Sequence, residues 1–291
     1  MAAPDNPWLR RRVLAFAHQG GAAEGPSSTL WAMERALEVG ADALELDVHA
    51  TADGQLVVCH DPTLERTTDR TGAIARAQLA ELRGVDAAYH FVPGEGARPG
   101  RGAAAYPLRG RARHDGRLGL ATLEAVLERF PGVPLNLDVK QRPPTVPAYE
   151  HRLVELLRAH GRGDDVIVAA FDERSTDAVA ALAPEVAVSA GRRSVAAFAA
   201  AVRLRLPVPA RLRRYVALQV PARVAGRPLV TGRFVAAAHE VGLAVHVWTI
   251  DAAAEMRQLV ELGVDGVMTD RPSVLAGVLA EAGATWRGSA A

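Results

Sequence analysis

The stretch ALELDVH at residues 43–49 alternates apolar and polar side chains, which is the two-residue period of a β-strand. Successive side chains of a strand point to opposite faces, so Glu45, Asp47 and His49 share one face. Carboxylates on the inner face of a barrel are costly to bury unless a cation neutralises them. The stretch therefore predicts a strand whose polar face borders a functional site.

Short aliphatic runs of this kind alternate along the chain with helical stretches rich in Ala, Leu, Glu and Arg. Eight strands, mostly each followed by a helix, predict a (β/α)8 TIM barrel, with an eight-stranded doubly wound sheet as the alternative. No GxGxxG pattern follows the first strand, which weakens a dinucleotide-binding interpretation. The predicted strands span residues 13–17, 43–48, 134–139, 165–170, 186–190, 215–220, 243–248 and 264–268. The predicted helices span residues 28–39, 78–83, 122–129, 147–160, 173–182, 193–203, 231–241, 252–262 and 271–282.

The length of 291 residues suits one barrel domain over residues 1–291, with an insertion at about 86–120 after the second strand. A hairpin strand over residues 55–59 precedes the insertion. The insertion is too long for an ordinary connection between a strand and a helix, and it follows a strand end that faces the active side of a barrel. A disordered insert and a substrate-contacting lid are the two interpretations. Its aromatic and imidazole side chains are Tyr89, His90, Phe91, Tyr106 and His114.

The charge balance argues against a dedicated nucleic-acid binder, because 34 Lys and Arg residues face 33 Asp and Glu residues. A single cysteine excludes an internal disulfide and favours a reducing compartment. No apolar stretch approaches the roughly 20 residues that a transmembrane helix requires. The apolar run VLAFA after Arg10–Arg12 is shorter than the roughly 7–15 residues of a signal-peptide core. We therefore expect a cytoplasmic protein.

Lys140 is the only lysine among the 34 basic residues, and the other 33 are arginines. Lysine is a compact point charge, whereas arginine is a wide planar fork. A lysine retained in so arginine-rich a chain suggests a site that accepts only the compact cation. Chance retention is the alternative.

Carboxylates at neighbouring strand ends predict a metal site. Glu45 and Asp47 belong to the second strand, and Asp138 shares a face of the third barrel strand with Asn136 and Lys140. Three carboxylates form an oxygen-rich set that suits Mg²⁺, Ca²⁺ or Mn²⁺. The alternative is a charge network that fills a polar layer of the barrel.

Two histidines flank this predicted metal site. His18 ends the first strand, and His60 follows the hairpin strand LVVCH. Two imidazoles can divide general-acid and general-base work near neutral pH, although each taken alone is more often structural. Cys59 alternates to the opposite face and is expected to be a buried, inert thiol.

The ends of the last two strands carry further candidates. Trp248 is expected either to wall a pocket or to pack the top of the barrel. Thr269 and Asp270 are typical of a helix N-cap region, with Pro272 at an early helical position. Free amides at that helix start could hold a phosphate, but a simple cap is sufficient to explain them.

Five segments taken together resemble the glycerophosphodiester phosphodiesterase family, over about Ala15 to Pro272. They are AHQGG (17–21), ELDVHATADGQLVVCHDPTLERTT (45–68), PLNLDVK (134–140), HVWTID (246–251) and GVDGVMTDRP (263–272). The resemblance implies a (β/α)8 barrel that hydrolyses glycerophosphodiesters to glycerol 3-phosphate and an alcohol. It also implies attack by the glycerol 2-hydroxyl, which gives a cyclic phosphate that water then opens.

The resemblance also implies roles for individual residues and one divalent cation as cofactor. The residues are His18 and His60 as the acid–base pair, Glu45, Asp47 and Asp138 as metal ligands, and Gln19, Lys140 and Trp248 as phosphate- or substrate-binding groups.

Three positions depart from the family pattern. Gln19 stands where the family has Arg, residues 27–29 read Ser-Ser-Thr in place of Glu-Asn-Thr, and Asp138 replaces a Glu. The first change removes a positive charge and a bidentate fork, and the second removes an acidic group near the metal.

Two compensating side chains are predicted for these changes. Glu24 is the candidate replacement for the missing acid, and an insertion arginine, Arg109 or Arg111, is the candidate replacement for the missing positive charge.

The leading hypothesis is a metal-dependent phosphodiesterase acting on a small glycerophosphodiester. A lysophospholipid-hydrolysing enzyme is the second, since Arg192–Arg214 interleaves seven arginines with apolar residues that could touch an anionic membrane. An ordinary outer helix and loop is the alternative for that segment. A barrel that only binds a phosphodiester is the third hypothesis. The sequence indicates no partner surface and no oligomeric state.

Overall fold

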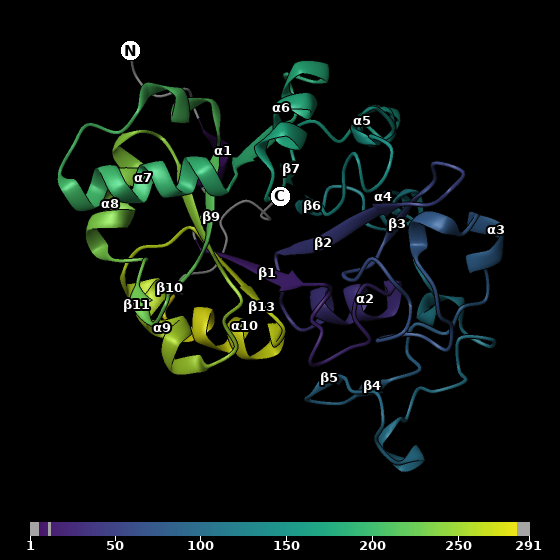
Figure 1. The fold of residues 1–291 in the computed structure, drawn as a ribbon. Helices are drawn as coiled ribbons and strands as arrows, with labels where there is room; N and C mark the ends of the chain where they lie inside the picture. The colour runs from purple at the N-terminus through teal and green to yellow at the C-terminus, as the bar shows by residue number, and fades with distance from the viewer. Residues whose placement is uncertain (1–5, 11–12, 284–291) are drawn as a thin grey trace.

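Eight parallel strands form a closed barrel in the computed structural model, which describes residues 6–10 and 13–283 (Figure 1). The barrel strands are β1 (Leu14–His18), β2 (Ala43–Ala50), β6 (Leu135–Val139), β7 (Val166–Ala169), β8 (Ala187–Ala190), β9 (Ala217–Pro221), β12 (Ala244–Trp248) and β13 (Gly266–Thr269). β1 pairs with β2 on one side and with β13 on the other, which closes the sheet. This closure confirms the TIM barrel and excludes the open doubly wound sheet.

A ninth strand, β3 (Leu56–Val58), pairs antiparallel with β2 and confirms the predicted hairpin. Outside the barrel, two short antiparallel pairs are formed by β4 (Phe91–Val92) with β5 (Gly96–Ala97), and by β10 (Arg223–Val224) with β11 (Arg227–Pro228). The first pair lies in the insertion, and the second lies between β9 and the helix that follows it.

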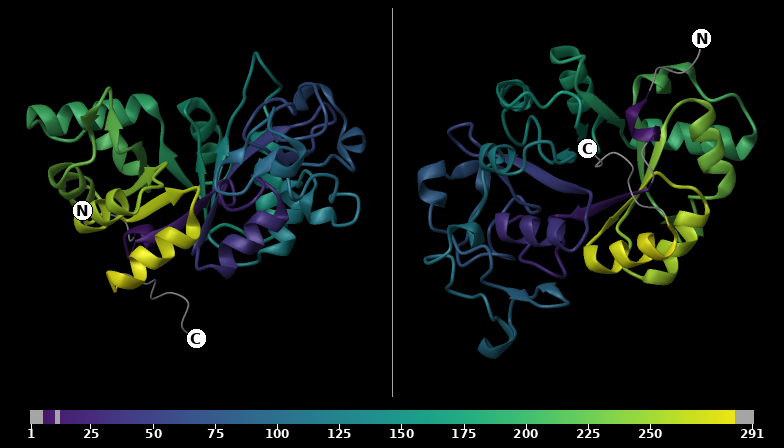
Figure 2. Two further views of the ribbon diagram at one scale, coloured as in Figure 1. Left: turned by 90° about the horizontal axis from the view of Figure 1, so that it is seen from below. Right: turned by 180° about the vertical axis from the view of Figure 1, so that it is seen from behind.

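Helices surround the barrel, and most of them connect successive barrel strands (Figure 2). They are α2 (Leu30–Glu38), α4 (Leu123–Arg129), α5 (Glu150–Ala159), α6 (Glu173–Leu182), α7 (Arg192–Leu204), α8 (Gly232–Glu240), α9 (Ala253–Glu261) and α10 (Pro272–Glu281). Shorter helical segments are α1 (Pro7–Arg10), α3 (Leu79–Leu82) and the 3₁₀ turns η1 (Ile74–Arg76), η2 (Ala103–Ala105), η3 (Gly116–Leu118) and η4 (Ala210–Arg214). Among the described residues, glycines with positive φ follow the C-caps of six helices, where a left-handed residue is favoured.

The apolar face of β2 packs outward against the helices, and its polar face lines the barrel interior. Leu44, Leu46 and Val48 belong to the large core between the strands and the helices. A smaller cluster fills the lower interior, where Trp8 and Phe16 are fully buried. Gly266 is required by close packing there, because a Cβ atom at this position would lie 2.8 Å from Phe16 Cε2. The interior is therefore apolar at the end where the strands begin and polar at the end where they finish.

The insertion is an ordered layer, so the expectation of a disordered insert is wrong. The Arg109 guanidinium lies 3.7 Å from the Tyr106 ring centre and 4.2 Å from the Tyr89 ring centre. Asp86 Oδ2 accepts a hydrogen bond from the backbone N–H of Gly110. These stacking and hydrogen-bonding contacts fix the segment without a large apolar core of its own.

Among the described residues, no helix has both the length and the apolar content to cross a bilayer. The cytoplasmic location stays a prediction. Arg11 and Arg12, on which part of the argument about an export signal depends, lie outside the described residues.

Candidate active site

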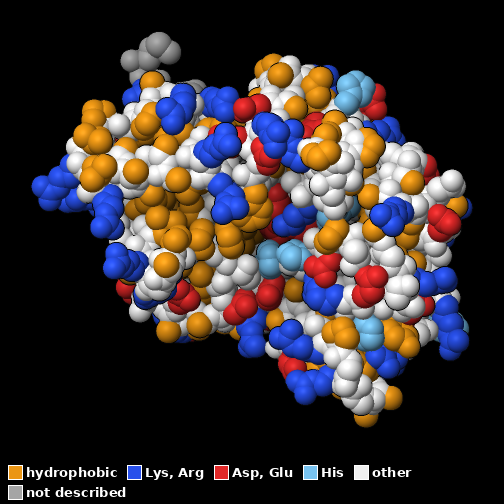
Figure 3. Space-filling view, in the orientation of Figure 1, with side chains coloured by type: hydrophobic (Ala, Val, Ile, Leu, Met, Phe, Trp, Pro, Cys, Tyr) orange, Lys and Arg blue, Asp and Glu red, His pale blue; other side chains and the backbone are white. Residues whose placement is uncertain are grey.

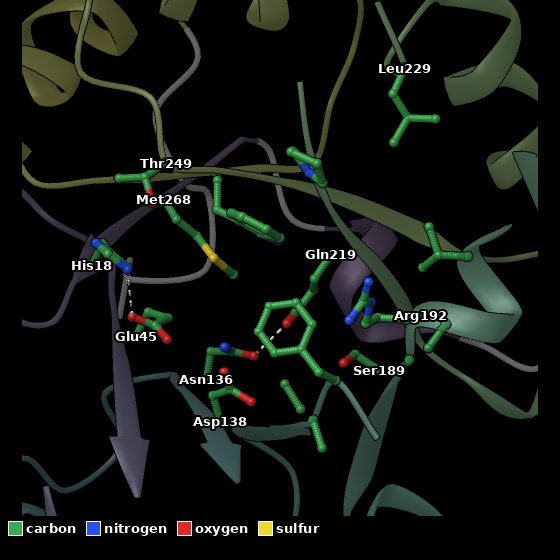
Figure 4. A pocket seen from close by; sticks show the side chains of 18 of the residues that line it. His18, Glu45, Asn136, Asp138, Ser189, Arg192, Gln219, Leu229, Thr249 and Met268 are labelled. Carbon is green, nitrogen blue, oxygen red and sulfur yellow. Dashed lines mark hydrogen bonds and ion pairs between the residues drawn. The ribbon is translucent and has the colours of Figure 1, made fainter. Parts of the chain in front are cut away.

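A cavity of about 710 Å³ opens at the carboxyl ends of the barrel strands, where TIM barrels place their active sites. At one end it is lined by polar side chains of β1, β2 and β6 (Figure 4). His60, from the loop after β3, lines the same end. The rest of the cavity is lined mostly by apolar side chains, together with Ser189, Arg192, Gln219 and Thr249. The predicted site residues that line it are His18, Glu45, His60, Asp138, Lys140 and Trp248.

Three carboxylates come together at the polar end. Asp47 and Asp138 are register partners on β2 and β6, and one oxygen of each lies within 4.8 Å of a Glu45 oxygen. Asp47 is fully buried; its Oδ1 lies 2.7 Å from Lys140 Nζ, and its Oδ2 accepts no hydrogen bond. A buried carboxylate oxygen without a donor is the kind of ligand that a hard cation satisfies. The cluster therefore fits the divalent cation that the sequence predicts.

Lys140 bridges two of these carboxylates. Its Nζ lies 2.7 Å from Asp47 Oδ1 and 2.7 Å from Asp138 Oδ2. Burial disfavours the charged amine, but Asp138 and Asp47 outweigh it and raise the pKa of Lys140 above its usual range. An ammonium carries three N–H donors, so one remains for the cavity that Lys140 lines. Part of the charge network that the sequence predicts is thus present, between Lys140 and two carboxylates of the cluster.

Burial disfavours the charged form of two carboxylates of the cluster. It raises the pKa of Glu45 to about 8, and the neighbouring Asp47 adds to this effect. Burial also raises the pKa of Asp138. Carboxyl groups held in this way bind protons in competition with a metal ion, so cation binding and proton release are linked here.

His18 is fixed by a carboxylate at the end of the adjacent strand. Its Nδ1 donates to Asp270 Oδ1 at 2.6 Å, and its Nε2 lies 3.8 Å from Glu45 Oε2. Burial lowers the pKa of His18, but Glu45 and Asp270 outweigh burial and raise that pKa to about 9. The imidazole therefore keeps one orientation, with Nε2 toward the carboxylate cluster.

His60 has a matching arrangement on the opposite side. Its Nδ1 donates to Asp61 Oδ1 at 2.7 Å, and Asp61 is in turn held by the Arg66 guanidinium. The hydrogen bond from His60, reinforced by Arg66, lowers the pKa of Asp61 well below its usual range. Behind them, the buried His49 contacts the His60 carbonyl oxygen through Nε2 at 3.3 Å. The ring centres of His60 and His18 are 6.4 Å apart.

Gln19 lies beside the site without lining the cavity. Its backbone N–H donates to Glu45 Oε2, and its side-chain Nε2 lies 3.3 Å from His18 Nε2. It adopts a left-handed φ of 52°, which turns the chain sharply after β1. Its contacts are thus with two predicted site residues, and its role in phosphate binding stays a prediction.

Asp61 and Arg66 beside His60 are not predicted from the sequence, and neither are two groups that come from distant parts of the chain. Asp270 was interpreted as part of a helix cap, whereas Arg271 is the N-cap residue of α10 and the Asp270 carboxylate accepts from His18. Barrel closure was the available signal, because it places the ends of β1 and β13 side by side. Gln219 is the second, and its side-chain amide donates to Asn136 Oδ1 inside the cavity. It comes from the opposite half of the barrel, so no local pattern points to it.

Neither of the expected compensations for the altered motifs lines the cavity. The Glu24 carboxylate accepts from the backbone N–H and the hydroxyl of Ser273 at the start of α10, and it does not line the main cavity. Arg109 is held by the Tyr89 carbonyl oxygen and by two tyrosine rings within the insertion. Arg111 does not line the cavity either.

No residue of 86–120 is among the described residues that line the cavity, so the substrate-contacting lid stays a prediction. The expectation for Cys59 is supported, since this thiol is buried and burial raises its pKa to about 12. A thiol with so high a pKa is a poor nucleophile near neutral pH.

Comparisons with known proteins agree with the fold and identify the family. The sequence model of the glycerophosphoryl diester phosphodiesterase family matches residues 18–274. A probable glycerophosphodiester phosphodiesterase 2 of Mycobacterium tuberculosis is 30% identical over 95% of this chain and 94% of its own. A glycerophosphodiester phosphodiesterase of Caldanaerobacter subterraneus is 27% identical over 94% of this chain and 100% of its own.

Solved structures show the same architecture. A phosphodiesterase of Oleispira antarctica, in complex with the product sn-glycerol-3-phosphate, superposes with a TM-score of 0.70 at 23% identity, covering 92% of this chain and 97% of its own. A putative glycerophosphoryl diester phosphodiesterase of Silicibacter pomeroyi superposes with a TM-score of 0.73 at 22% identity, covering 95% of this chain and 96% of its own. With a family match over nearly the whole chain, this protein belongs to the glycerophosphoryl diester phosphodiesterase family of enzymes.

Proposed function

We propose that this protein is a metal-dependent phosphodiesterase that converts a glycerophosphodiester and water into glycerol 3-phosphate and an alcohol. The observation that carries the proposal is the placement of two histidines on one cavity beside a carboxylate cluster. His18 and His60 each have Nδ1 bound to a carboxylate, and their ring centres are 6.4 Å apart. Family membership supports the reaction, and the product in the Oleispira antarctica structure supports glycerol 3-phosphate.

Glu45, Asp47 and Asp138 would hold one divalent cation, with Mg²⁺ or Ca²⁺ preferred and Mn²⁺ as the third candidate. Such a cation supplies positive charge that offsets the anionic oxygens of the phosphodiester. Lys140 adds a fixed positive charge at the same place, and its remaining N–H donates to a phosphate oxygen. Trp248 walls the substrate pocket, and Gln19 is the candidate for a further phosphate contact beside His18.

The two histidines exchange protons with the reacting oxygens. As the glycerol 2-hydroxyl bonds to phosphorus, its proton passes to Nε2 of one histidine. The bond from phosphorus to the alcohol oxygen breaks, and Nε2–H of the other histidine protonates that oxygen. Water then opens the cyclic phosphate with the two roles exchanged, which restores both protonation states. Asp270 and Asp61 keep each Nδ1 protonated, so Nε2 of each ring is the atom that exchanges protons.

Release of glycerol 3-phosphate from glycerophosphocholine tests the proposal. Metal-stripped protein should be inactive, and Mg²⁺, Ca²⁺ or Mn²⁺ added separately should restore turnover. His18→Ala should abolish the restored activity, with a loss of at least about 100-fold in kcat. His151→Ala is the matched control, because this histidine side chain is 73% exposed on α5.

Metal-dependent binding of glycerophosphocholine without turnover would contradict the proposed enzyme and would support a barrel that only binds a phosphodiester. Equal losses of activity in His18→Ala and His151→Ala would contradict the catalytic role assigned to His18. Turnover that persists after complete removal of metal would contradict the role of the carboxylate cluster.

A further inference from the structure

The cavity continues past the catalytic groups along an apolar wall. Val195, Ala196 and Ala199 contribute to it from α7, and Val224 and Leu229 contribute from the β10–β11 hairpin and the residue that follows it. We call these five residues the α7–hairpin wall. In Figure 4, Leu229 lies at the far side of the cavity from His18 and Glu45.

The α7–hairpin wall is open to solvent, although it is apolar. Val224 is 54% exposed, and Figure 3 shows hydrophobic side chains gathered in a hollow beside the central histidines. Every acidic residue that lines the cavity lies at the catalytic end, and Arg192 is the only charged lining residue from the elements that form the wall. An apolar surface that borders a catalytic site and faces water is typical of a binding site for an apolar group.

The hairpin part of the wall is held in place by its backbone. Ala225 and Gly226 both have positive φ, at 47° and 75°, as in the two-residue turns that suit β-hairpins. At the base of the hairpin, the Ala222 carbonyl oxygen accepts from the N–H groups of Leu229 and Val230 at 2.9 and 3.2 Å. The wall is therefore a preformed surface, so an apolar ligand pays little ordering cost when it binds there.

We propose that the α7–hairpin wall binds the hydrocarbon chain of a monoacyl glycerophosphodiester, so that the enzyme acts on lysophospholipids such as lysophosphatidylcholine. This inference rests on the proposed function, because the catalytic end must bind the phosphodiester. The free glycerol hydroxyl that attacks phosphorus cannot be acylated, which leaves one glycerol oxygen for an acyl chain. Water and lysophosphatidylcholine then give lysophosphatidic acid and choline, with cleavage of the bond between phosphorus and the choline oxygen.

Choline release from a series of substrates tests the inference. The series contains glycerophosphocholine and lysophosphatidylcholines with butanoyl, hexanoyl and octanoyl chains, each kept below its micelle-forming concentration. A fully buried methylene contributes about fourfold to binding, and the wall is open on one side. We therefore expect kcat/KM to rise at least about tenfold between the butanoyl and octanoyl substrates.

A pair of variants on one helix locates the effect. Ala196→Asp places a charge on the wall, and it should lower kcat/KM for the octanoyl substrate at least about tenfold more than for glycerophosphocholine. Ala200→Asp is the matched control, because Ala200 is exposed one turn further along α7 and does not line the cavity. It should leave the chain-length dependence unchanged.

Hydrolysis of glycerophosphocholine with no dependence on chain length would overturn the inference and leave the proposed function intact. No hydrolysis of any substrate in the series would overturn both. Faster hydrolysis of a glycerophospho-N-acylethanolamine than of lysophosphatidylcholine with the same chain would contradict a chain attached to the glycerol, since the chain would then leave with the alcohol.

Discussion

His18 and Asp270 are joined by a hydrogen bond of 2.6 Å between Nδ1 and Oδ1, although 252 positions separate them in the sequence. Barrel closure creates this pair, because β1 and β13 are parallel neighbours and both residues lie at the carboxyl ends of these strands. The carboxylate fixes the tautomer of His18 and turns its Nε2 toward Glu45. Asp270 is thus a positioning residue for one of the two proposed catalytic histidines.

Asp270→Asn should lower kcat by about 100-fold or more, because the amide no longer stabilises the charged imidazole. The pH profile of kcat should also change, since loss of the carboxylate lowers the pKa of His18. Steady-state hydrolysis of glycerophosphocholine across pH measures both effects. Asp177→Asn on the surface of α6 is the control, and a comparable loss in that variant would indicate a general effect on folding.

Arg66→Ala should lower kcat by about tenfold, because Arg66 holds the Asp61 carboxylate that orients His60. Arg66 also helps to lower the pKa of Asp61, so its removal should shift the acidic limb of the pH profile to higher pH. Arg66→Lys should restore the charge but not the bidentate contact. Arg70→Ala, a change at a more exposed arginine nearby, should be silent, and an unshifted acidic limb in Arg66→Ala would remove the proposed role.

Metal binding should weaken as pH falls below about 8, because burial raises the pKa of Glu45 to about 8 and a bound cation requires the deprotonated carboxylate. The expected change in Kd is about tenfold for each pH unit below that pKa. Titration calorimetry of metal-stripped protein in two buffers of different ionisation enthalpy measures both Kd and the protons released. Asp47→Asn should abolish binding, and a Kd independent of pH would contradict the protonated state of Glu45.

Gly266→Ala should destabilise the barrel by about 1–3 kcal/mol, because the added Cβ meets the Phe16 and His246 rings at 2.8 and 2.9 Å. Gly277→Ala is its matched counterpart in α10, where nothing lies within 4 Å of the added atom. That change should stabilise the protein by about 0.5–1 kcal/mol through helix propensity. Urea unfolding of both variants measures the two free energies, and the same sign in both would refute the packing argument.

The pair of His239 and Asp265 should make stability depend on pH. The hydrogen bond to Asp265 Oδ2, at 2.8 Å, raises the pKa of His239 above its usual value of about 6.5. The stabilising contribution of the His239–Asp265 pair is therefore complete below about pH 6.5, and it is lost as pH rises through the pKa of His239 in the folded protein. The difference in unfolding free energy between the wild type and His239→Gln should shrink between about pH 6 and pH 9. A constant difference across this range would show that the pair is not linked to protonation.

The sequence alone determined the elements of the barrel and most of the polar residues of the site. Alternation along ALELDVH separated a core-facing set from a polar set, because side chains of a strand point to opposite faces by geometry alone. The burial cost of carboxylates then made Glu45, Asp47 and Asp138 candidates for a cation site, and these three lie together. Such inferences succeed because they depend on neighbours in the chain or on the common end of parallel strands.

The tertiary structure alone decided which distant side chains act on one another. Asp270 meets His18, and Gln219 meets Asn136, only because the sheet closes and brings strands from both halves of the chain to one cavity. Glu24 and Arg109 are drawn away from the site by Ser273 and by two tyrosines, which no local pattern predicts. The apolar wall has the same origin, since α7 and the β10–β11 hairpin follow different strands and face one cavity only after the barrel forms. Local periodicity fixes the direction in which a side chain points, whereas its partner is fixed by packing over the whole chain.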